Sequence, residues 1–305
     1  MKFDCYFMKG HLSPIIMLEL DELFQKMNWE IDELSDVKKS LYKRYCEILK
    51  LIKVEEQNLL IDLSYRFEQI GIADYIEFFL MSFHSIEESK LDAKEKIIFA
   101  PLIRPYIDNK KAKGKIEKPK TKSAQFLFYL LHGQDLRWID YSSKFEFLET
   151  IRSVKESYIE DKSLLILIDD FVGSGKTAID CIKSIKSEIE IDKKISFSDI
   201  CVISIAAQNE GVVRLETELG VKVYCDRIRQ KGITDFYPTN TVNKNMDLML
   251  SIENTLKCPK EFSLGFENSE ALITFMNKTP NNTFPVYWHE TDKKIAPFPR
   301  YKIYK

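Results

Sequence analysis

The chain has 305 residues, a formal net charge of −2, 45% hydrophobic residues and 12% aromatic residues. This length allows one large or two modest domains, and the apolar fraction is ample for a buried core, so we expect a globular protein. The near-neutral charge gives no general attraction to nucleic acid. No apolar run approaches the roughly 20 residues of a membrane span, and the amino terminus lacks the long apolar stretch of a signal peptide. We therefore expect a cytoplasmic protein.

The first third of the chain has a helical pattern. Apolar residues recur three and four positions apart, with charges between them, in segments 16–20, 41–52, 59–70 and 76–83. This spacing predicts packed helices. We expect a helical region over 1–95 and a second domain over 96–305. The charged faces of the helices indicate solvated surface, and an apolar face beyond what the core needs would indicate a docking surface for a partner; the sequence leaves both open.

A basic segment follows the first predicted strand. Residues 97–100 form a short apolar run typical of a strand, and 110–122 are rich in lysine. Charge runs of this kind are usually solvated loops. The alternative is a lid whose lysines approach a diphosphate when substrate binds. An apolar helix is predicted over 126–131, and Ser123 is placed to cap it.

The most informative segment, residues 165–177, reads Leu-Ile-Leu-Ile-Asp-Asp-Phe-Val-Gly-Ser-Gly-Lys-Thr. Its four branched apolar residues suit a strand that is covered on both faces, and residues 177–182 begin a helical pattern. Asp169, Asp170 and the small-residue loop therefore lie at a strand-to-helix turn. Free backbone N–H groups and the positive end of the helix dipole meet there, which favours a bound phosphate.

Two alternatives compete at this turn. Gly175-Lys176-Thr177 ends the pattern of a nucleotide-triphosphate loop, which also requires glycine at position 170. The chain has Asp170 there, and a carboxylate would repel the polyphosphate, so this interpretation is disfavoured. It predicts ATP turnover that is lost in Lys176→Ala. Acidic pairs after strands can also be ordinary turn residues.

The next segments repeat the strand and helix alternation. Strands are predicted over 200–207 and 221–225, with a helix over 210–219 between them. This alternation predicts an α/β fold with a parallel sheet, and ligands bind beyond the carboxyl ends of such strands. Gln208 occupies one of these ends.

The carboxy-terminal part holds stiff, polar and aromatic segments. Trp288 could stack on a ligand ring, and Asn281 or Asn282 could hydrogen-bond its polar edges. A turn that buries the tryptophan is an equally good interpretation.

Residues 165–177 resemble the phosphoribosyl-diphosphate motif of type I phosphoribosyltransferases. The resemblance implies an α/β fold with a parallel sheet of that kind, preceded here by the helical region. It implies that Asp169 and Asp170 are the catalytic pair that holds the ribose 2′ and 3′ hydroxyls. It implies that the 5′-phosphate is held by Gly173, Ser174, Gly175, Lys176 and Thr177.

The same resemblance extends to more residues. It makes Lys122 and Ser123 candidates for the pyrophosphate loop, and it makes a carboxy-terminal hood, with Gln208, Asn281, Asn282 and Trp288, a candidate acceptor pocket. Gly173 stands where some members of the family carry aspartate and others threonine. This departure puts a standard purine-salvage reaction in doubt.

Three segments, the acidic-pair loop 165–177, the strand end 206–211 and the ending 279–288, also resemble the phosphoribosyltransferase-like effectors of bacterial conflict and antiphage systems. The resemblance covers about residues 55–305, and some of these effectors are similar to accessory proteins of retrons. This implies a toxin-type effector that acts at the anomeric carbon of phosphoribosyl diphosphate or of a nucleotide, as a glycosyltransferase or an N-glycosidic-bond hydrolase. It also implies a silencing partner, either a reverse transcriptase with its DNA or a small DNA-binding protein.

Magnesium is the expected cofactor. Mg²⁺ is usually held by few protein ligands together with substrate phosphates, so it would bridge diphosphate and ribose oxygens and contact Asp169 and Asp170 indirectly. The alternative function is a non-catalytic module that senses a phosphoribosyl ligand and signals through the amino-terminal helices. Gly173 favours this alternative.

Overall fold

The structure is a computed structural model that describes residues 12–103, 123–149, 162–188, 196–291 and 294–300. The chain forms two compact units, one of residues 73–229 and one that combines residues 1–72 with 230–305. These units differ from the expected division at residue 95. Residues 73–95 belong with the sheet, and residues 230–305 belong with the amino-terminal helices. Local periodicity predicts helices, but it contains no information about which distant segments pack together.

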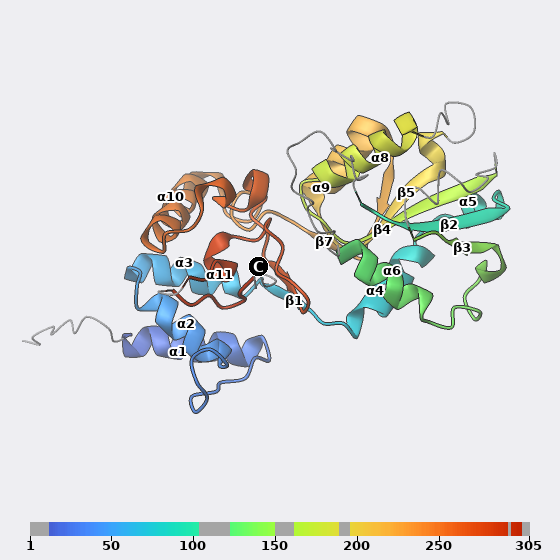
Figure 1. Cartoon of the computed structure of the whole chain (residues 1–305). Helices are drawn as coiled ribbons and strands as arrows, with labels where there is room; N and C mark the ends of the chain where they lie inside the picture. Colours follow the sequence, from blue (N-terminus) through green and yellow to red (C-terminus); the bar gives the residue numbers. More distant parts are fainter. Residues whose placement is uncertain (1–11, 104–122, 150–161, 189–195, 292–293, 301–305) are drawn as a thin grey trace, which may run out of the picture. The chain divides into compact units, whose positions relative to one another are not determined.

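The unit of residues 73–229 is built on a parallel sheet, in which Figure 1 labels β2, β3, β4, β5 and β7. The strand order is β3-β2-β4-β5-β6. Its strands are β2 (Lys96–Pro101), β3 (Phe145–Phe147), β4 (Ser163–Val172), β5 (Ile200–Gln208) and β6 (Lys222–Tyr224). A further strand, β7 (Arg227–Arg229), pairs with the end of β5, and every pair in the sheet is parallel. The predicted α/β fold with a parallel sheet is confirmed.

Helices cover both faces of this sheet. Helices α8 (Lys176–Glu188) and α9 (Asn209–Leu219) pack on one face, and α4 (Asp74–His84) and α6 (Ser123–His132) lie on the other (Figure 1). Short helices α5 (Glu88–Asp92), η1 (Ser142–Lys144) and η2 (Phe197–Asp199) complete the unit. Residues 163–168 of β4 are all buried, as expected for a strand that is covered on both faces.

The strand register brings several chain segments to one edge of the sheet. Pro101 at the end of β2 pairs with Ile168, and Val172 at the end of β4 pairs with Ala207. Gln208 in turn pairs with Arg229. Helices α8 and α9 begin soon after β4 and β5 end. The carboxyl edge of the sheet therefore carries Asp169 and Asp170 together with two helix amino termini.

The second unit is mainly helical. It contains α1 (Pro14–Lys26), α2 (Leu41–Leu49), α3 (Val54–Ser64), α10 (Thr239–Thr255), α11 (Pro285–Trp288) and the short helices η3 (Lys260–Phe262) and η4 (Phe266–Asn268). Strands β1 (Glu68–Ile70) and β8 (Ile273–Phe275) pair in parallel. The helix predicted over 59–70 is therefore wrong at 68–70, because those residues pair with a strand two hundred positions away in sequence, which local spacing does not reveal. Within the described ranges, no helix combines the length and apolar composition needed to cross a membrane.

Segments from both ends of the chain share the core of this unit. The Phe67 ring stacks on the Phe298 ring at 4.5 Å between centroids, and Tyr287 lies 4.6 Å from Phe67. The buried Arg44 guanidinium donates to the Ala296 carbonyl at 2.8 Å and to the Glu290 carboxylate at 2.9 Å. These contacts explain why residues 230–300 fold with the amino-terminal helices.

Candidate functional site

Two adjacent carboxylates lie near the end of the central strand β4. Asp170 is 6% exposed and Asp169 is half-buried. The Asp170 backbone N–H donates to the Asp169 carboxylate at 2.9 Å. Burial, and next the negative charge of Asp170, raise the pKa of Asp169 well above its usual range. The pair therefore resists full ionisation, and a proton on Asp169 is retained to a higher pH than on an exposed aspartate.

The amino terminus of α6 reaches this acidic pair. Ser123 is the first residue of α6, and its side chain forms a hydrogen bond with Asp169 that opposes the rise in pKa. The structure thus brings one pyrophosphate-loop candidate next to the acidic pair. The other candidate, Lys122, lies outside the described residues, as does the whole basic segment 110–122.

A short glycine-rich loop follows the strand. Residues 173–175 connect β4 to α8, in which Lys176 and Thr177 are the first two residues and are exposed. Gly175 has φ +76°, in the left-handed region that glycine adopts without strain. Its carbonyl accepts the Ile179 N–H at 2.9 Å, which starts the helix. The backbone N–H groups of this loop therefore lie at the positive end of α8.

The loop packs against the first turn of α9 through backbone atoms. A Cβ atom on Gly211 would lie 2.0 Å from the Gly173 carbonyl oxygen and 3.0 Å from the Gly175 nitrogen. Arg214, one turn further along α9, donates from its guanidinium to the Ser174 carbonyl at 3.3 Å and also binds Glu218 at 2.8 Å. Helix α9 thus fixes the loop both by close contact and by a charged hydrogen bond.

The carboxyl edge of the sheet favours the binding of an anion. The amino termini of α6, α8 and α9 lie there, and each contributes partial positive charge. Arg229 is brought to the same edge by its pairing with Gln208. Sequence reasoning missed Arg214 and Arg229, because their positions depend on the packing of α9 and on the pairing of β7.

The predicted site residues fall into two groups. Asp169, Asp170, Ser123, Gln208 and the loop 173–177 lie together in the unit of residues 73–229. Asn281, Asn282 and Trp288 belong to the helical unit. There the Trp288 indole N–H donates to the Thr283 carbonyl at 2.7 Å, and the Asn282 amide donates to the Ser269 hydroxyl at 3.1 Å. Both side chains thus have structural roles within their own unit.

Within the described ranges, the protein has no cluster of side chains that could hold a metal ion by themselves. No group of three or more His, Cys, Asp or Glu side chains there is arranged to hold a metal ion. The adjacent carboxylates of Asp169 and Asp170 are the pair available at the sheet edge. Mg²⁺ that is held chiefly by substrate phosphates needs only one or two carboxylates, so these residues fit such an ion.

The fold and the carboxyl edge of the sheet define the class of protein: a parallel α/β protein that has an acidic pair and a glycine-rich loop at the strand ends. The chain matches the family model PRTase-CE over residues 11–302. It therefore belongs to this phosphoribosyltransferase-like family. A comparison with curated proteins gives no match.

Proposed function

We propose that the carboxyl edge binds phosphoribosyl diphosphate or a nucleotide and that the protein transfers or releases the group on the anomeric carbon. The observation that carries this proposal is the single segment that places two carboxylates, Asp169 and Asp170, two residues before a loop at a helix amino terminus. The carboxylates suit ribose hydroxyls, and the loop suits the terminal phosphate.

The chemistry follows from this arrangement. The bond between the anomeric carbon and its leaving group breaks, the electron pair leaves with the diphosphate or the base, and an acceptor or water forms the new bond. Positive charge develops on the sugar ring in the transition state, as in other glycosyl transfers. The buried Asp170 carboxylate is fixed in the strand, so it stabilises this charge without reorganising. Asp169 holds a hydroxyl by accepting or donating according to its protonation.

Magnesium completes the proposal as the expected cofactor. When bound, it would neutralise charge on the diphosphate, and Asp169 and Asp170 would hold it indirectly, through ribose and diphosphate oxygens. The chain's own residues supply the seat for the phosphate through the loop and hold the sugar through the acidic pair.

Purified protein incubated with phosphoribosyl diphosphate, Mg²⁺ and a panel of bases, nucleotides and water tests the proposal. Diphosphate or free base release, followed by mass spectrometry, should reveal turnover, and Asp170→Asn should abolish it with the fold intact. Asp140→Asn removes an exposed carboxylate of the same unit and should leave turnover unchanged. Full activity of an Asp169 and Asp170 double variant would refute the proposal.

A second candidate function is a non-catalytic sensor of a phosphoribosyl ligand. Gly173 favours it, because the loop lacks the aspartate or threonine side chain that family members carry there, and its carbonyl packs on Gly211 instead. Calorimetry together with product analysis distinguishes the sensor from the enzyme. A sensor gives binding heat with phosphoribosyl diphosphate but forms no product.

The proposal extends to the biological role of the protein. We propose a toxin-type effector of antiphage defence that a partner keeps silent, on the strength of the resemblance of segments 165–177, 206–211 and 279–288 to such effectors. Expression of the chain alone should then slow bacterial growth, and Asp170→Asn should remove the toxicity.

A further inference from the structure

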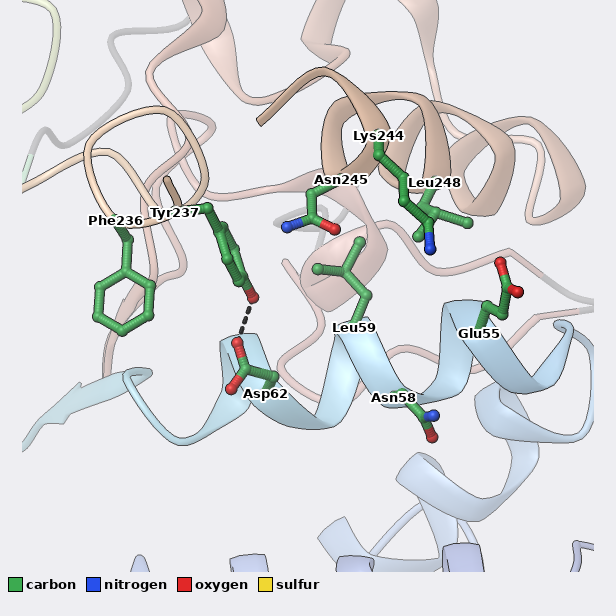
Figure 2. Close-up of a pocket in the computed structure, with 9 residues that line it drawn as sticks. All are labelled: Glu55, Asn58, Leu59, Asp62, Phe236, Tyr237, Lys244, Asn245 and Leu248. Atoms are coloured by element: carbon green, nitrogen blue, oxygen red, sulfur yellow. Dashed lines mark hydrogen bonds between the residues drawn. The ribbon is translucent and has the colours of Figure 1, made fainter. Parts of the chain in front are cut away.

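The helical unit contains a groove that the proposed function does not use. It lies between α3 and α10, has a volume of about 360 Å³ and is lined by Glu55, Asn58, Leu59, Asp62, Phe236, Tyr237, Lys244, Asn245 and Leu248 (Figure 2). This volume is within the range of roughly 300–1,000 Å³ that is typical of small-molecule sites. All of its lining residues belong to one compact unit.

One end of the groove is aromatic and held in place by hydrogen bonds. The Tyr237 hydroxyl donates to the Asp62 carboxylate (Figure 2), and burial followed by this bond raises the pKa of Tyr237. Arg66 donates to the Gly232 carbonyl at 2.7 Å and places its guanidinium 3.5 Å from the centre of the Phe236 ring. This end is therefore preformed, and its aromatic surface suits an apolar group.

The middle of the groove is apolar. Leu59 from α3 is 5% exposed and half-buried Leu248 comes from α10, so aliphatic surface from both helices forms the floor. Asn245 points from α10 towards this floor (Figure 2). An amide beside an apolar floor can hydrogen-bond a polar group of an occupant whose side chain lies on the leucines.

The other end carries two opposite charges, those of Glu55 and Lys244. Glu55 reaches up from α3 and Lys244 reaches down from α10 towards the same end of the groove (Figure 2). Both side chains are exposed, and among the described residues neither takes part in a hydrogen bond or an ion pair through its charged group. The carboxylate of Asp62, in contrast, already accepts from Tyr237 and Arg66.

We propose that this groove binds a zwitterionic ligand with an apolar side chain, namely a free α-amino acid or a dipeptide. Its ammonium group lies on Glu55, its carboxylate lies on Lys244, and its side chain lies on Leu59 and Leu248 and points towards Tyr237. Charge complementarity decides the choice of ligand. Two charges of opposite sign that form no ion pair within the described residues share one end, and an apolar floor with an aromatic wall extends away from them.

Calorimetry with the full chain tests the proposal, with L-phenylalanine, L-leucine and the dipeptide leucyl-phenylalanine as probes. At least one of them should bind. N-acetyl-L-phenylalanine amide has the same side chain without the two charges and should bind at least about tenfold more weakly. Comparison of the dissociation constants of the amino acids and the dipeptide then shows whether the groove prefers a free amino acid or a dipeptide.

Matched variants test the two charged contacts. Glu55→Gln and Lys244→Gln should each raise the dissociation constant about tenfold, the effect of one lost charge-assisted hydrogen bond. Asp247→Asn and Lys260→Gln change exposed charges outside the groove and should leave it unchanged. Because all four side chains are exposed, the thermal midpoint should not change. The proposal is overturned if no probe binds at millimolar concentration, if the uncharged amide binds as tightly as phenylalanine, or if neither groove variant weakens binding.

Discussion

Gly211 and Gly173 are in direct backbone contact, so close that a single added methyl group at position 211 would lie 2.0 Å from the Gly173 carbonyl oxygen. The same turn of α9 also lies close to Gly175, because a Cβ atom on Gly175 would lie 2.9 Å from the Gly211 carbonyl oxygen. Real Cβ atoms do not approach backbone oxygen so closely, so the loop after β4 and the first turn of α9 can only coexist in this form with glycine at positions 211 and 175.

Gly211→Ala should therefore displace the loop and weaken binding of phosphoribosyl diphosphate. The rate of turnover should fall on the order of a hundredfold, the effect of misplacing a positioning group by about 1 Å. Calorimetry measures the accompanying loss of affinity for the ligand. Gly133→Ala is the matched control, since its Cβ atom would meet nothing closer than 3.4 Å. Unchanged affinity in Gly211→Ala would show that the loop does not hold the ligand.

Asp169→Asn should stabilise the fold at neutral pH while it impairs ligand binding. Burial and the charge of Asp170 raise the pKa of Asp169, so its ionisation at neutral pH destabilises the folded state. Removing the charge should raise the free energy of unfolding at neutral pH, because the folded state disfavours the ionised carboxylate and the unfolded state does not. Urea unfolding of both proteins measures the difference.

The difference in the free energy of unfolding between the wild-type and Asp169→Asn proteins should depend on pH. The folded pKa of Asp169 lies above the unfolded value, so the wild-type protein loses stability as pH rises from the unfolded pKa, about 4 for aspartate, to the folded pKa. The advantage of Asp169→Asn should vanish near pH 4, grow with pH and then level off. A constant difference at all pH values would contradict the assigned cause.

The motif segment was predictable because its signals are local. Four branched apolar residues, two aspartates and a glycine-rich turn specify a buried strand, an acidic pair and a helix start within thirteen positions, and β4 and α8 form at those places. Long-range relationships were not predictable in this way. The pairing of Ile70 with Phe275 and the contact of Gly211 with Gly173 depend on segments that meet only in the folded chain.

Arg214→Met tests whether the charged hydrogen bond from α9 supports the loop. The substitution removes the bond to the Ser174 carbonyl and the pair with Glu218 but keeps a side chain of similar length. Affinity for phosphoribosyl diphosphate should fall by roughly threefold to tenfold, since a single hydrogen bond contributes about 1 kcal/mol net. Arg137→Met, at an exposed ion pair of the same unit, is the control and should bind ligand normally. Equal affinity in the two variants would leave the Gly211 contact as the support of the loop.

Arg44→Ala should strongly destabilise the helical unit. The buried guanidinium donates to the Lys38 and Ala296 carbonyls and to Glu290, so truncation leaves several buried acceptors without their donor. Loss of one partner in such a network costs roughly 2 to 4 kcal/mol. Lys50→Ala, at an exposed ion pair with Glu47, should cost less than about 1 kcal/mol. Urea unfolding, followed by the fluorescence of Trp29 and Trp288 in this unit, measures both; a similar small loss in the two variants would show that the carboxy-terminal segment does not depend on Arg44.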